Sequence, residues 1–284
     1  MSWIKKLLAG LAAHPVGWAL CSPWAKVGNY LYAVHDQKLN HQKGLDREKR
    51  LEAISNQIFP DKEVIFGPFK GLKYPAFEAK GSALFPKLLG TYEAELHQVI
   101  EEICTKPYSN IINVGCGEGY YAVGLAKRLP AANILAFDID EEAQRLTKKM
   151  AQVNNCENRV DVRGMCTSDF LSTFQFSGKA LIICDCEGFE KDLFNKSISN
   201  LKQCDLLIET HDFIDITISS TLRQLFGASH NMKSIFSSDD LHKPNLYARA
   251  PIDGFSLQER YEFMREGRPS VMEWLYLTPK TNSF

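Results

Sequence analysis

The chain has 284 residues, of which 45% are hydrophobic and 24% are charged, so its composition is that of an ordinary globular protein. Its 33 basic and 34 acidic residues give a formal net charge of -1, which argues against a basic protein built to bind nucleic acid. The eight cysteines include no C-x-x-C pair, which argues against the common zinc patterns and favours free thiols in a reducing, cytoplasmic location.

The first 60 residues are predicted to be helical. Lys5 and Lys6 precede an apolar run that resembles a weak signal peptide, but His14 and Pro15 interrupt it. The run is also too short and too broken to span a bilayer. We therefore expect an amphipathic helix that packs on the protein, with contact to a membrane surface as the less favoured alternative.

The segment from residue 61 to residue 95 has a different pattern. "KEVIFGPFKGLKYP" holds two short β-rich runs around a Gly-Pro turn, which predicts a hairpin. "LLGTYEAELHQVIEEICTK" follows with apolar residues at helical spacing, and Thr91 is placed to cap that helix. We expect residues 1–95 to form a helical region with a β-hairpin, on the substrate side of a main domain at 96–284.

From residue 108 onward, predicted strands alternate with predicted helices. The apolar runs at 110–115, 133–140, 159–165, 179–189 and 204–213 are expected to be strands, and 120–130 and 141–155 to be helices. This order is typical of right-handed βαβ units. "RPSVMEWLYLTPK" near the C-terminus is expected to add antiparallel strands. The predicted fold class is α/β, with a Rossmann-like, doubly wound and mostly parallel sheet.

A glycine-rich loop joins the first predicted strand to its helix in "NIINVGCGEGYYAVGLAKRLP". The dinucleotide fingerprint G-x-G-x-x-G needs its last glycine for close packing around a pyrophosphate. Here Tyr120 occupies that position, and the glycines are Gly115, Gly117 and Gly119. The loop therefore brings bare backbone to a ligand, but it does not favour a pyrophosphate.

Asp138 ends the second predicted strand, about twenty residues after the loop, where a carboxylate can accept both hydroxyls of a ribose. A cofactor with a ribose and no diphosphate at the loop is therefore expected. S-adenosylmethionine has this chemistry, because it joins an adenosine to a short amino-acid tail through a sulfonium.

Several stretches together resemble the class I S-adenosylmethionine-dependent methyltransferases. They are "VGCGEGYY", "AFDIDEEAQRL" and "VNN", and with "CDCEGFE" and "LLIETHDF" the chain resembles the FkbM-type branch in particular. That branch has a D-x-E-G-x-E motif, matched here by Asp185, Glu187, Gly188 and Glu190. The resemblance covers about residues 105–215. It implies a methyltransferase-type Rossmann-like fold and S-adenosylmethionine as the cofactor.

The resemblance also indicates which residues bind the cofactor. They are expected to be Asn113, Gly115, Cys116, Gly117, Gly119, Asp138, Met165 and Asp185. Asn113 stands where the family usually has an acid, and its carbonyl oxygen can still accept a hydrogen bond from an ammonium group. Met165 and Cys166 stand where many relatives have an acid for the adenine, so packing and backbone contacts would hold that ring.

The catalytic residues are expected at the carboxyl ends of the fourth and fifth strands, where ligands lie in open α/β sheets. Asp185 would orient the acceptor or the sulfonium region, Glu187 would bind an acceptor hydroxyl or the base, and His211 would be the general base. A divalent metal shared by Asp185, Glu209 and His211 is a weaker possibility, because the spacing after the fifth strand is not diagnostic.

The acceptor implied by the FkbM-type resemblance is a hydroxyl group on a sugar or a natural-product-like small molecule. Arg265 and Arg268 are candidates for holding an anionic acceptor, although ion pairs are an equally good use of them. Two other functions stay open. One is a methyltransferase-like protein that binds a ligand without turnover, and the other is a nicotinamide-dependent oxidoreductase, against which the glycine spacing argues.

Overall fold

The computed structural model describes residues 3–196, 198–246 and 251–280. Its contacts divide the chain into two compact units, Met1–Ile54 and Ser55–Phe284. The first unit consists of helix α1 (Trp3–Ala13) and most of helix α2 (Pro15–Ile58). The prediction of a helical N-terminal region is therefore confirmed for the described residues. No helix among them is long and apolar enough to cross a membrane.

The segment that leads into the sheet is built mainly from turns and short helices. They are α3 (Leu84–Leu89), the 3₁₀ helix η1 (Ala94–Leu96) and α4 (His97–Cys104). The predicted hairpin is reduced to one antiparallel bridge between Glu63 and Lys73. The prediction that Thr91 caps a helix is wrong, because Gly90 ends α3 in a left-handed conformation and the Thr91 hydroxyl donates to the Pro86 carbonyl.

The second unit contains a seven-stranded sheet in the order β3-β2-β1-β4-β5-β7-β6. Its strands are β1 (Asn110–Val114), β2 (Asn133–Phe137), β3 (Val160–Arg163), β4 (Ala180–Cys184), β5 (Asp205–Thr210), β6 (His230–Phe236) and β7 (Glu273–Pro279). The first five strands are parallel, and β7 is antiparallel to both of its neighbours. The predicted Rossmann-like, doubly wound and mostly parallel sheet is confirmed.

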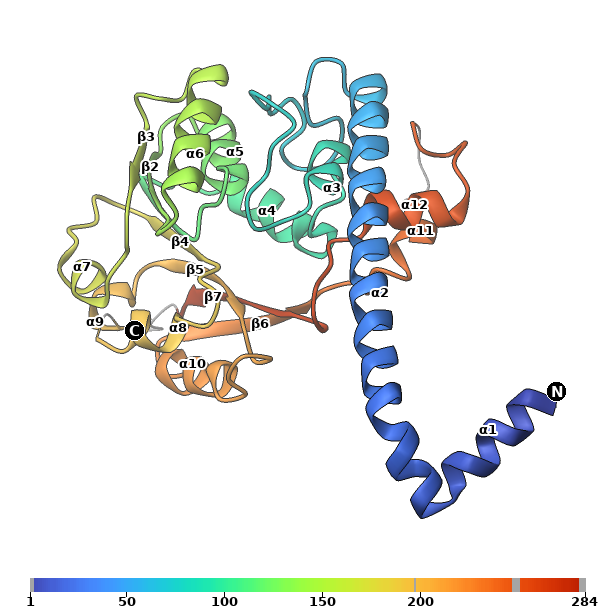
Figure 1. Cartoon of the computed structure of the whole chain (residues 1–284). Helices are drawn as coiled ribbons and strands as arrows, with labels where there is room; N and C mark the ends of the chain where they lie inside the picture. Colours follow the sequence, from blue (N-terminus) through green and yellow to red (C-terminus); the bar gives the residue numbers. More distant parts are fainter. Residues whose placement is uncertain (1–2, 197, 247–250, 281–284) are drawn as a thin grey trace. The chain divides into compact units, whose positions relative to one another are not determined.

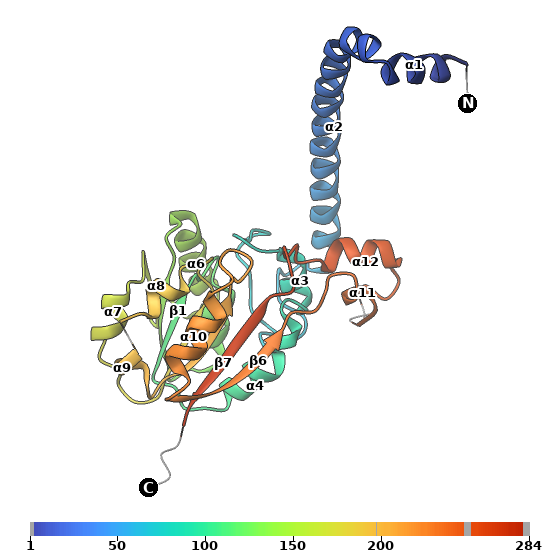
Figure 2. The same ribbon diagram turned by 90° about the horizontal axis from the view of Figure 1, so that it is seen from below.

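Helices cover both faces of this sheet (Figures 1 and 2). Strand order runs outward from β1 to β3 in one direction and from β4 to β5 in the other, so right-handed crossovers place their helices on opposite faces. Figure 1 shows α5 (Tyr120–Arg128) and α6 (Glu141–Val153) on one side of the strands and α10 (Ile218–Phe226) on the other. The β1–β4 boundary is therefore a topological switch point, where ligands bind.

The core explains why these residues form strands. The runs of β4 and β5 are buried along their whole length, as expected for parallel strands that are covered on both faces. Ile182, Ile208 and Leu275 from three neighbouring strands are fully buried and pack with Phe194 and Phe226 from the covering helices. Burial of each such side chain contributes about 1.5–3 kcal/mol, which fixes the sheet beneath the functional site.

Several elements were not predicted from the sequence. They are β6 and the helices α7 (Ser168–Thr173), α8 (Glu190–Phe194), α9 (Ile198–Leu201), α10, α11 (Lys243–Leu246) and α12 (Leu257–Met264). Residues 55–95 group with the sheet in the second compact unit. Whether they act as a separate substrate-side cap, with a boundary at residues 95 and 96, stays a prediction.

Candidate functional site

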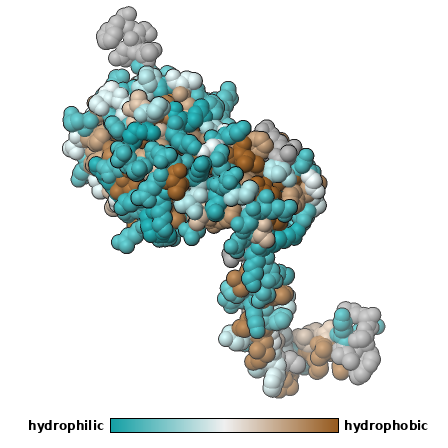
Figure 3. Space-filling model, turned by 90° about the horizontal axis from the view of Figure 1, so that it is seen from above, coloured by the Kyte–Doolittle hydropathy of each residue, from teal (hydrophilic) through white to brown (hydrophobic). Residues whose placement is uncertain are grey.

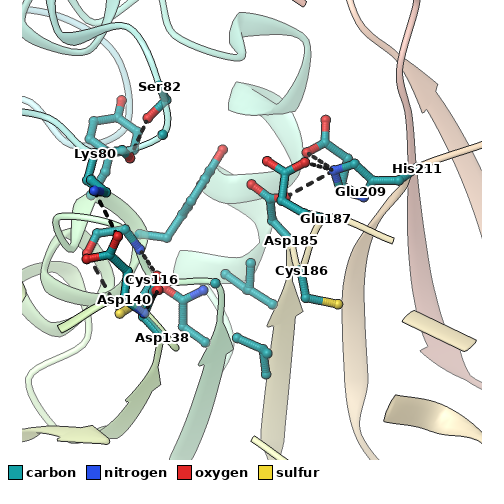
Figure 4. Close-up of a pocket in the computed structure, with 18 of the residues that line it drawn as sticks. Lys80, Ser82, Cys116, Asp138, Asp140, Asp185, Cys186, Glu187, Glu209 and His211 are labelled. Carbon is teal, nitrogen blue, oxygen red and sulfur yellow. Dashed lines mark hydrogen bonds and ion pairs between the residues drawn. The ribbon is translucent and has the colours of Figure 1, made fainter. Parts of the chain in front are cut away.

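One large cavity lies at the carboxyl ends of β1, β2, β4 and β5, next to the switch point. Its volume is about 640 Å³. Figure 4 shows two groups of polar side chains in it, with Lys80, Asp138 and Asp140 on one side and Asp185, Glu187, Glu209 and His211 on the other. The cavity is large enough for a nucleoside-sized cofactor and a small acceptor together.

The glycine loop forms the floor of the cavity. Gly115 has a φ of 74°, and a Cβ atom at this position would lie 1.6 Å from the carbonyl oxygen of Asp185. No side chain fits there, so the backbone of β1 runs directly against the backbone that follows β4. Gly119 caps α5 with a φ of 100°, and its missing Cβ faces Thr147. Gly119 therefore serves helix packing and is not among the residues that line the cavity.

Asp138 lies at the end of β2 and holds the loop. One carboxylate oxygen accepts a hydrogen bond from the Gly117 amide at 2.9 Å, and the other accepts from the Asp140 amide at 2.9 Å. A carboxylate has about four lone-pair positions, so acceptor capacity remains for hydroxyl groups. The side chain is thus held between the glycine loop and the segment before α6, and its role in binding a ribose stays a prediction.

Asn113 is a buried polar residue without a partner. It is 1% exposed, and neither its Oδ1 nor its Nδ2 atom makes a hydrogen bond to the described residues. An unpaired buried amide costs about 1–3 kcal/mol, so a ligand group is the natural partner. Because Asn113 lines the cavity beside Gly115, its amide fits a polar ligand tail at the loop.

The other predicted cofactor residues also line this cavity. Cys116 is buried, and burial raises the pKa of its thiol to about 12, so it is an uncharged packing group. Met165 is 56% exposed and lines the outer rim together with Ile139 and Phe189. These three apolar side chains provide a surface for a flat ring, as expected where no acid follows β3.

A buried ion pair ties the glycine loop to the segment before the sheet. Glu118 is 2% exposed and accepts hydrogen bonds from the Tyr74 hydroxyl, the Lys80 amide and the Lys87 ammonium group. Lys87 is 4% exposed and lies over the Tyr92 ring at 4.7 Å. Sequence reasoning missed this anchor, because charged residues in a loop do not by themselves indicate burial.

Four acidic or basic side chains meet on the far side of the cavity (Figure 4). The Nε2 atom of His211 lies 3.4 Å from Asp185 Oδ1, 3.4 Å from Glu187 Oε2 and 3.9 Å from Glu209 Oε2. Asp185 and Glu187 come from the loop after β4, and Glu209 and His211 from the end of β5. The structure therefore brings together all three predicted catalytic residues, and their roles stay predictions.

Glu190 contacts His211 on the side of the ring opposite the other three carboxylates. Its carboxylate is fully buried and lies 2.7 Å from His211 Nδ1. Burial lowers the pKa of His211, but the hydrogen bond and the charges of the surrounding carboxylates outweigh burial, so that pKa is raised. His211 is therefore more basic than a free imidazole. The D-x-E-G-x-E motif contains Glu190, yet the sequence alone also allowed a simple helix-cap role.

We call the carboxylates of Asp185, Glu187 and Glu209 the acidic wall of the cavity. Arg268 pairs with one of them and with two further carboxylates. Its guanidinium group forms ion pairs with Glu93 at 2.6 Å, with Glu266 at 3.0 Å and with Glu209. Its side chain is 13% exposed, so this arginine is committed to three carboxylates and does not offer a free charge to an anionic acceptor. Glu93 and Glu266, which sequence reasoning missed, come from segments 173 residues apart.

The acidic wall also changes the titration of its members. Burial and the charges of Glu93 and Glu187 raise the pKa of Asp185, against the effect of Glu209 and Arg268. Burial and the charge of Asp185 raise the pKa of Glu209. Neighbouring buried carboxylates with raised pKa values are typical of sites that hold protons or cations.

One family model matches the part of the chain that contains the glycine loop. A family model described as "Ribosomal protein L11 methyltransferase (PrmA)" matches residues 96–184, which is less than half of the chain. The matched range contains β1, the glycine loop, Asp138 and β4. This match supports a methyltransferase enzyme and, with it, the S-adenosylmethionine that such enzymes use. No curated protein sequence matches the chain.

Solved structures of similar topology include several methyltransferases. A putative precorrin-6Y C5,15-methyltransferase domain from Corynebacterium diphtheriae is 14% identical, with 65% of this chain and 96% of that chain covered and a TM-score of 0.42. The precorrin 8W decarboxylase of Methanobacterium thermoautotrophicum is 16% identical, with 65% and 89% covered and a TM-score of 0.45. A geranyl diphosphate methyltransferase is 10% identical, with 66% and 80% covered and a TM-score of 0.41. The fold assignment itself is based on the strand order of this chain.

Proposed function

We propose that this protein is an S-adenosylmethionine-dependent O-methyltransferase that acts on a hydroxyl group of a sugar or a natural-product-like small molecule. The observation that carries the proposal is the unpaired, buried Asn113 beside Gly115, opposite the Asp138 carboxylate in one cavity. These groups complement a cofactor with a polar amino-acid tail at one end and a ribose at the other.

The residues present fit this cofactor. Asn113 would bind the polar groups of the methionine tail, Asp138 would accept the ribose hydroxyls, and Met165 with Ile139 would cover the adenine. Gly115 lets the backbone after β1 pack directly against the Asp185 carbonyl group, which closes the floor of the cavity beneath the cofactor. When bound, the cofactor supplies a methyl group on a positively charged sulfur, which is activated for displacement.

The chain's own residues must align the acceptor and remove its proton. Methyl transfer to a hydroxyl group would release the hydroxyl proton, which the chain would have to accept. His211, which Glu190 makes more basic, and Asp185, whose pKa is raised, would be the groups that receive that proton. Glu187 would hold a hydroxyl group of the acceptor at the mouth of the cavity.

Support for a hydroxyl acceptor comes from the FkbM-type motif and from the acidic wall. Neutral hydroxyl groups donate hydrogen bonds to carboxylates, and the wall offers carboxylate oxygens from Asp185, Glu187 and Glu209. An anionic acceptor is disfavoured, because Arg268 is occupied by three carboxylates. A cytoplasmic location stays a prediction from the free thiols.

Calorimetric titration with S-adenosylhomocysteine, and with NADH as the comparison ligand, tests the cofactor. We expect micromolar binding of the first and no binding of the second. Asp138→Ala should weaken binding about tenfold to a hundredfold, because it removes hydrogen bonds between ribose hydroxyls and a charged acceptor. Asp161→Ala is the matched control, since Asp161 is on β3 and pairs only with Arg163 among the described side chains. Equal affinities of the two variants would contradict the proposed orientation.

The acceptor is tested by following S-adenosylhomocysteine release with a panel of sugars and polyhydroxylated compounds. His211→Ala should leave cofactor affinity unchanged and depress turnover at neutral pH. Cofactor binding without release on any acceptor would favour the second function, a methyltransferase-like protein without turnover. The substitution of Asn113 for the usual acid is the observation that favours it.

A further inference from the structure

The cluster around His211 has the geometry of a cation site. Two ligands bound to one ion at about 2.1 Å are about 3.0 Å apart at right angles and about 3.4 Å apart at tetrahedral angles. His211 Nε2 is 3.4 Å from both Asp185 Oδ1 and Glu187 Oε2, and 3.9 Å from Glu209 Oε2. One ligand atom each from Asp185, Glu209 and His211 lies within 4.8 Å of the others. Small side-chain movements would therefore bring all of them to an ion.

The buried Glu190 is the second observation. Its Oε1 atom lies 2.7 Å from His211 Nδ1, which leaves Nε2 directed at the other three carboxylates. A histidine whose far nitrogen contacts a buried carboxylate is the usual arrangement of metal-binding histidines, because it fixes the tautomer and the ring. Glu190 is not among the residues that line the cavity, and its Oε1 atom contacts both His211 Nδ1 and the Gly188 amide.

The charges of the cluster are also unbalanced. Arg268 pairs with Glu209 through Oε1 and leaves Oε2 directed toward His211. Asp185 Oδ1 has no hydrogen-bond donor among the described residues, although it is shielded from solvent. Carboxylates from Asp185, Glu187 and Glu209 thus face one imidazole, and a cation between them would pair with Asp185 Oδ1.

We propose that Asp185, Glu209 and His211 bind one divalent cation, with Glu187 as a further ligand at the mouth of the cavity. Carboxylate oxygens with one imidazole nitrogen suit Mn²⁺ or Mg²⁺ better than softer metals. Cation binding does not depend on the proposed methyl transfer. If that function holds, the ion lies where the acceptor hydroxyl must bind, and it would fix the acceptor and make its proton more acidic; with the ion bound, His211 would be a ligand and would not receive that proton.

The proposal is tested by measuring Mn²⁺ binding to the full chain with calorimetry and with electron paramagnetic resonance. We expect one Mn²⁺ per chain, with a directly bound nitrogen seen in the spin-echo modulation. His211→Ala should remove the nitrogen signal, and Glu209→Gln should weaken binding at least tenfold. Glu190→Gln should weaken binding about tenfold to a hundredfold, as loss of an orienting carboxylate does elsewhere.

Asp138→Asn is the matched control, because it removes a carboxylate from the other side of the same cavity. It should keep Mn²⁺ affinity and lose affinity for S-adenosylhomocysteine, whereas Glu209→Gln should do the reverse. Folding of every variant is checked by circular dichroism and thermal unfolding. Absence of Mn²⁺ binding at millimolar concentration, or binding that His211→Ala and Glu209→Gln leave intact, overturns the proposal. Failure of cofactor binding alone would overturn only the proposed function.

A second observation concerns the first compact unit, taken by itself. Its two helices carry a group of exposed large apolar residues, which we call the N-terminal apolar face and which appears as brown patches on the helices in Figure 3. The face consists of Leu7, Leu8, Leu11, Val16, Trp18, Leu20, Trp24, Val27, Tyr30, Leu31 and Tyr32. Soluble surfaces rarely expose so many large apolar side chains together, so the face is expected to contact something.

Charge indicates what the face contacts. The only formally charged side chains among residues 1–35 are Lys5, Lys6 and Lys26, and the first acidic residue of the chain is Asp36. Exposed tryptophan and tyrosine are the residues that prefer the interface between lipid and water, and lysine is attracted to anionic headgroups. We infer that the N-terminal apolar face lies on an anionic membrane surface without crossing it.

Co-sedimentation of the full chain with vesicles tests this inference. We expect binding to vesicles of phosphatidylcholine with 30% phosphatidylglycerol, about tenfold weaker binding to phosphatidylcholine alone, and loss of binding in Trp18→Ser/Trp24→Ser. Leu39→Ser/Leu45→Ser is the matched control, because these leucines are exposed on α2 beyond the face. No vesicle binding, or a concentration-dependent dimer that Trp18→Ser/Trp24→Ser dissolves, would overturn the inference, the second by making another copy the partner.

Discussion

Replacement of Gly115 by alanine tests whether the glycine loop works as the structure indicates. The new Cβ atom would lie 1.6 Å from the Asp185 carbonyl oxygen, and the backbone at this position has a φ of 74°. A left-handed alanine costs about 1–2 kcal/mol, and the forced movement of β1 from the loop after β4 adds about 1–3 kcal/mol. We therefore expect a loss of about 2–5 kcal/mol, a large part of the stability of an ordinary domain.

The assay is thermal and urea unfolding, together with titration of S-adenosylhomocysteine. For a unit of this size each kcal/mol corresponds to about 2–4 °C, so Tm should fall by about 4–20 °C. Cofactor affinity should fall at least tenfold, because the loop moves. Gly164→Ala is the matched control, since Gly164 also lines the cavity but has no heavy atom within 4 Å of the added Cβ. Equal stability and equal affinity of the two variants would refute the close approach of Gly115 to the Asp185 carbonyl oxygen.

Three further predictions concern stability. Lys87→Met should cost about 3–5 kcal/mol in urea unfolding, because it leaves Glu118 buried without its cation, and adding Glu118→Leu should recover part of this loss; an additive double variant would contradict it. Asp140→Ala should lower the urea concentration at the unfolding midpoint, since Asp140 caps α6 by accepting from the Glu142 amide, and an unchanged midpoint would count against the cap. Burial raises the pKa of Glu95 from its ordinary value near 4.5 to about 7, so the folded state holds a proton that the unfolded state releases, and stability falls as pH rises from about 4.5 through 7. At pH 8.5, Glu95→Gln should therefore have a free energy of unfolding up to about 3 kcal/mol higher than the parent, measured by urea unfolding, and at pH 4.5 the two should differ little. A difference in free energy of unfolding that does not grow with pH would contradict this.

The sequence by itself determined the architecture of the sheet and the place of the site. Alternating apolar strands and amphipathic helices allow only a few topologies, and ligands bind where the strand order reverses. The spacing of Gly115, Gly117 and Asp138 follows from covalent connectivity, because a loop, a helix and the next strand end must meet at one edge. These are local patterns, and local patterns can be recognised in a single sequence.

Tertiary structure alone decided which charged residues are buried and with what partners. Glu93, Glu266 and Arg268 look like surface charges in the sequence, and only long-range packing brings them together. Glu190 could have been a helix cap, and its contact with His211 depends on the spacing between β4 and β5. Ionic contacts of this kind join residues that are far apart in the chain and leave no periodic pattern. Residues on both sides of the cavity could therefore be named from the ends of the predicted strands, whereas the ion pairs that hold Glu209 and His211 could not.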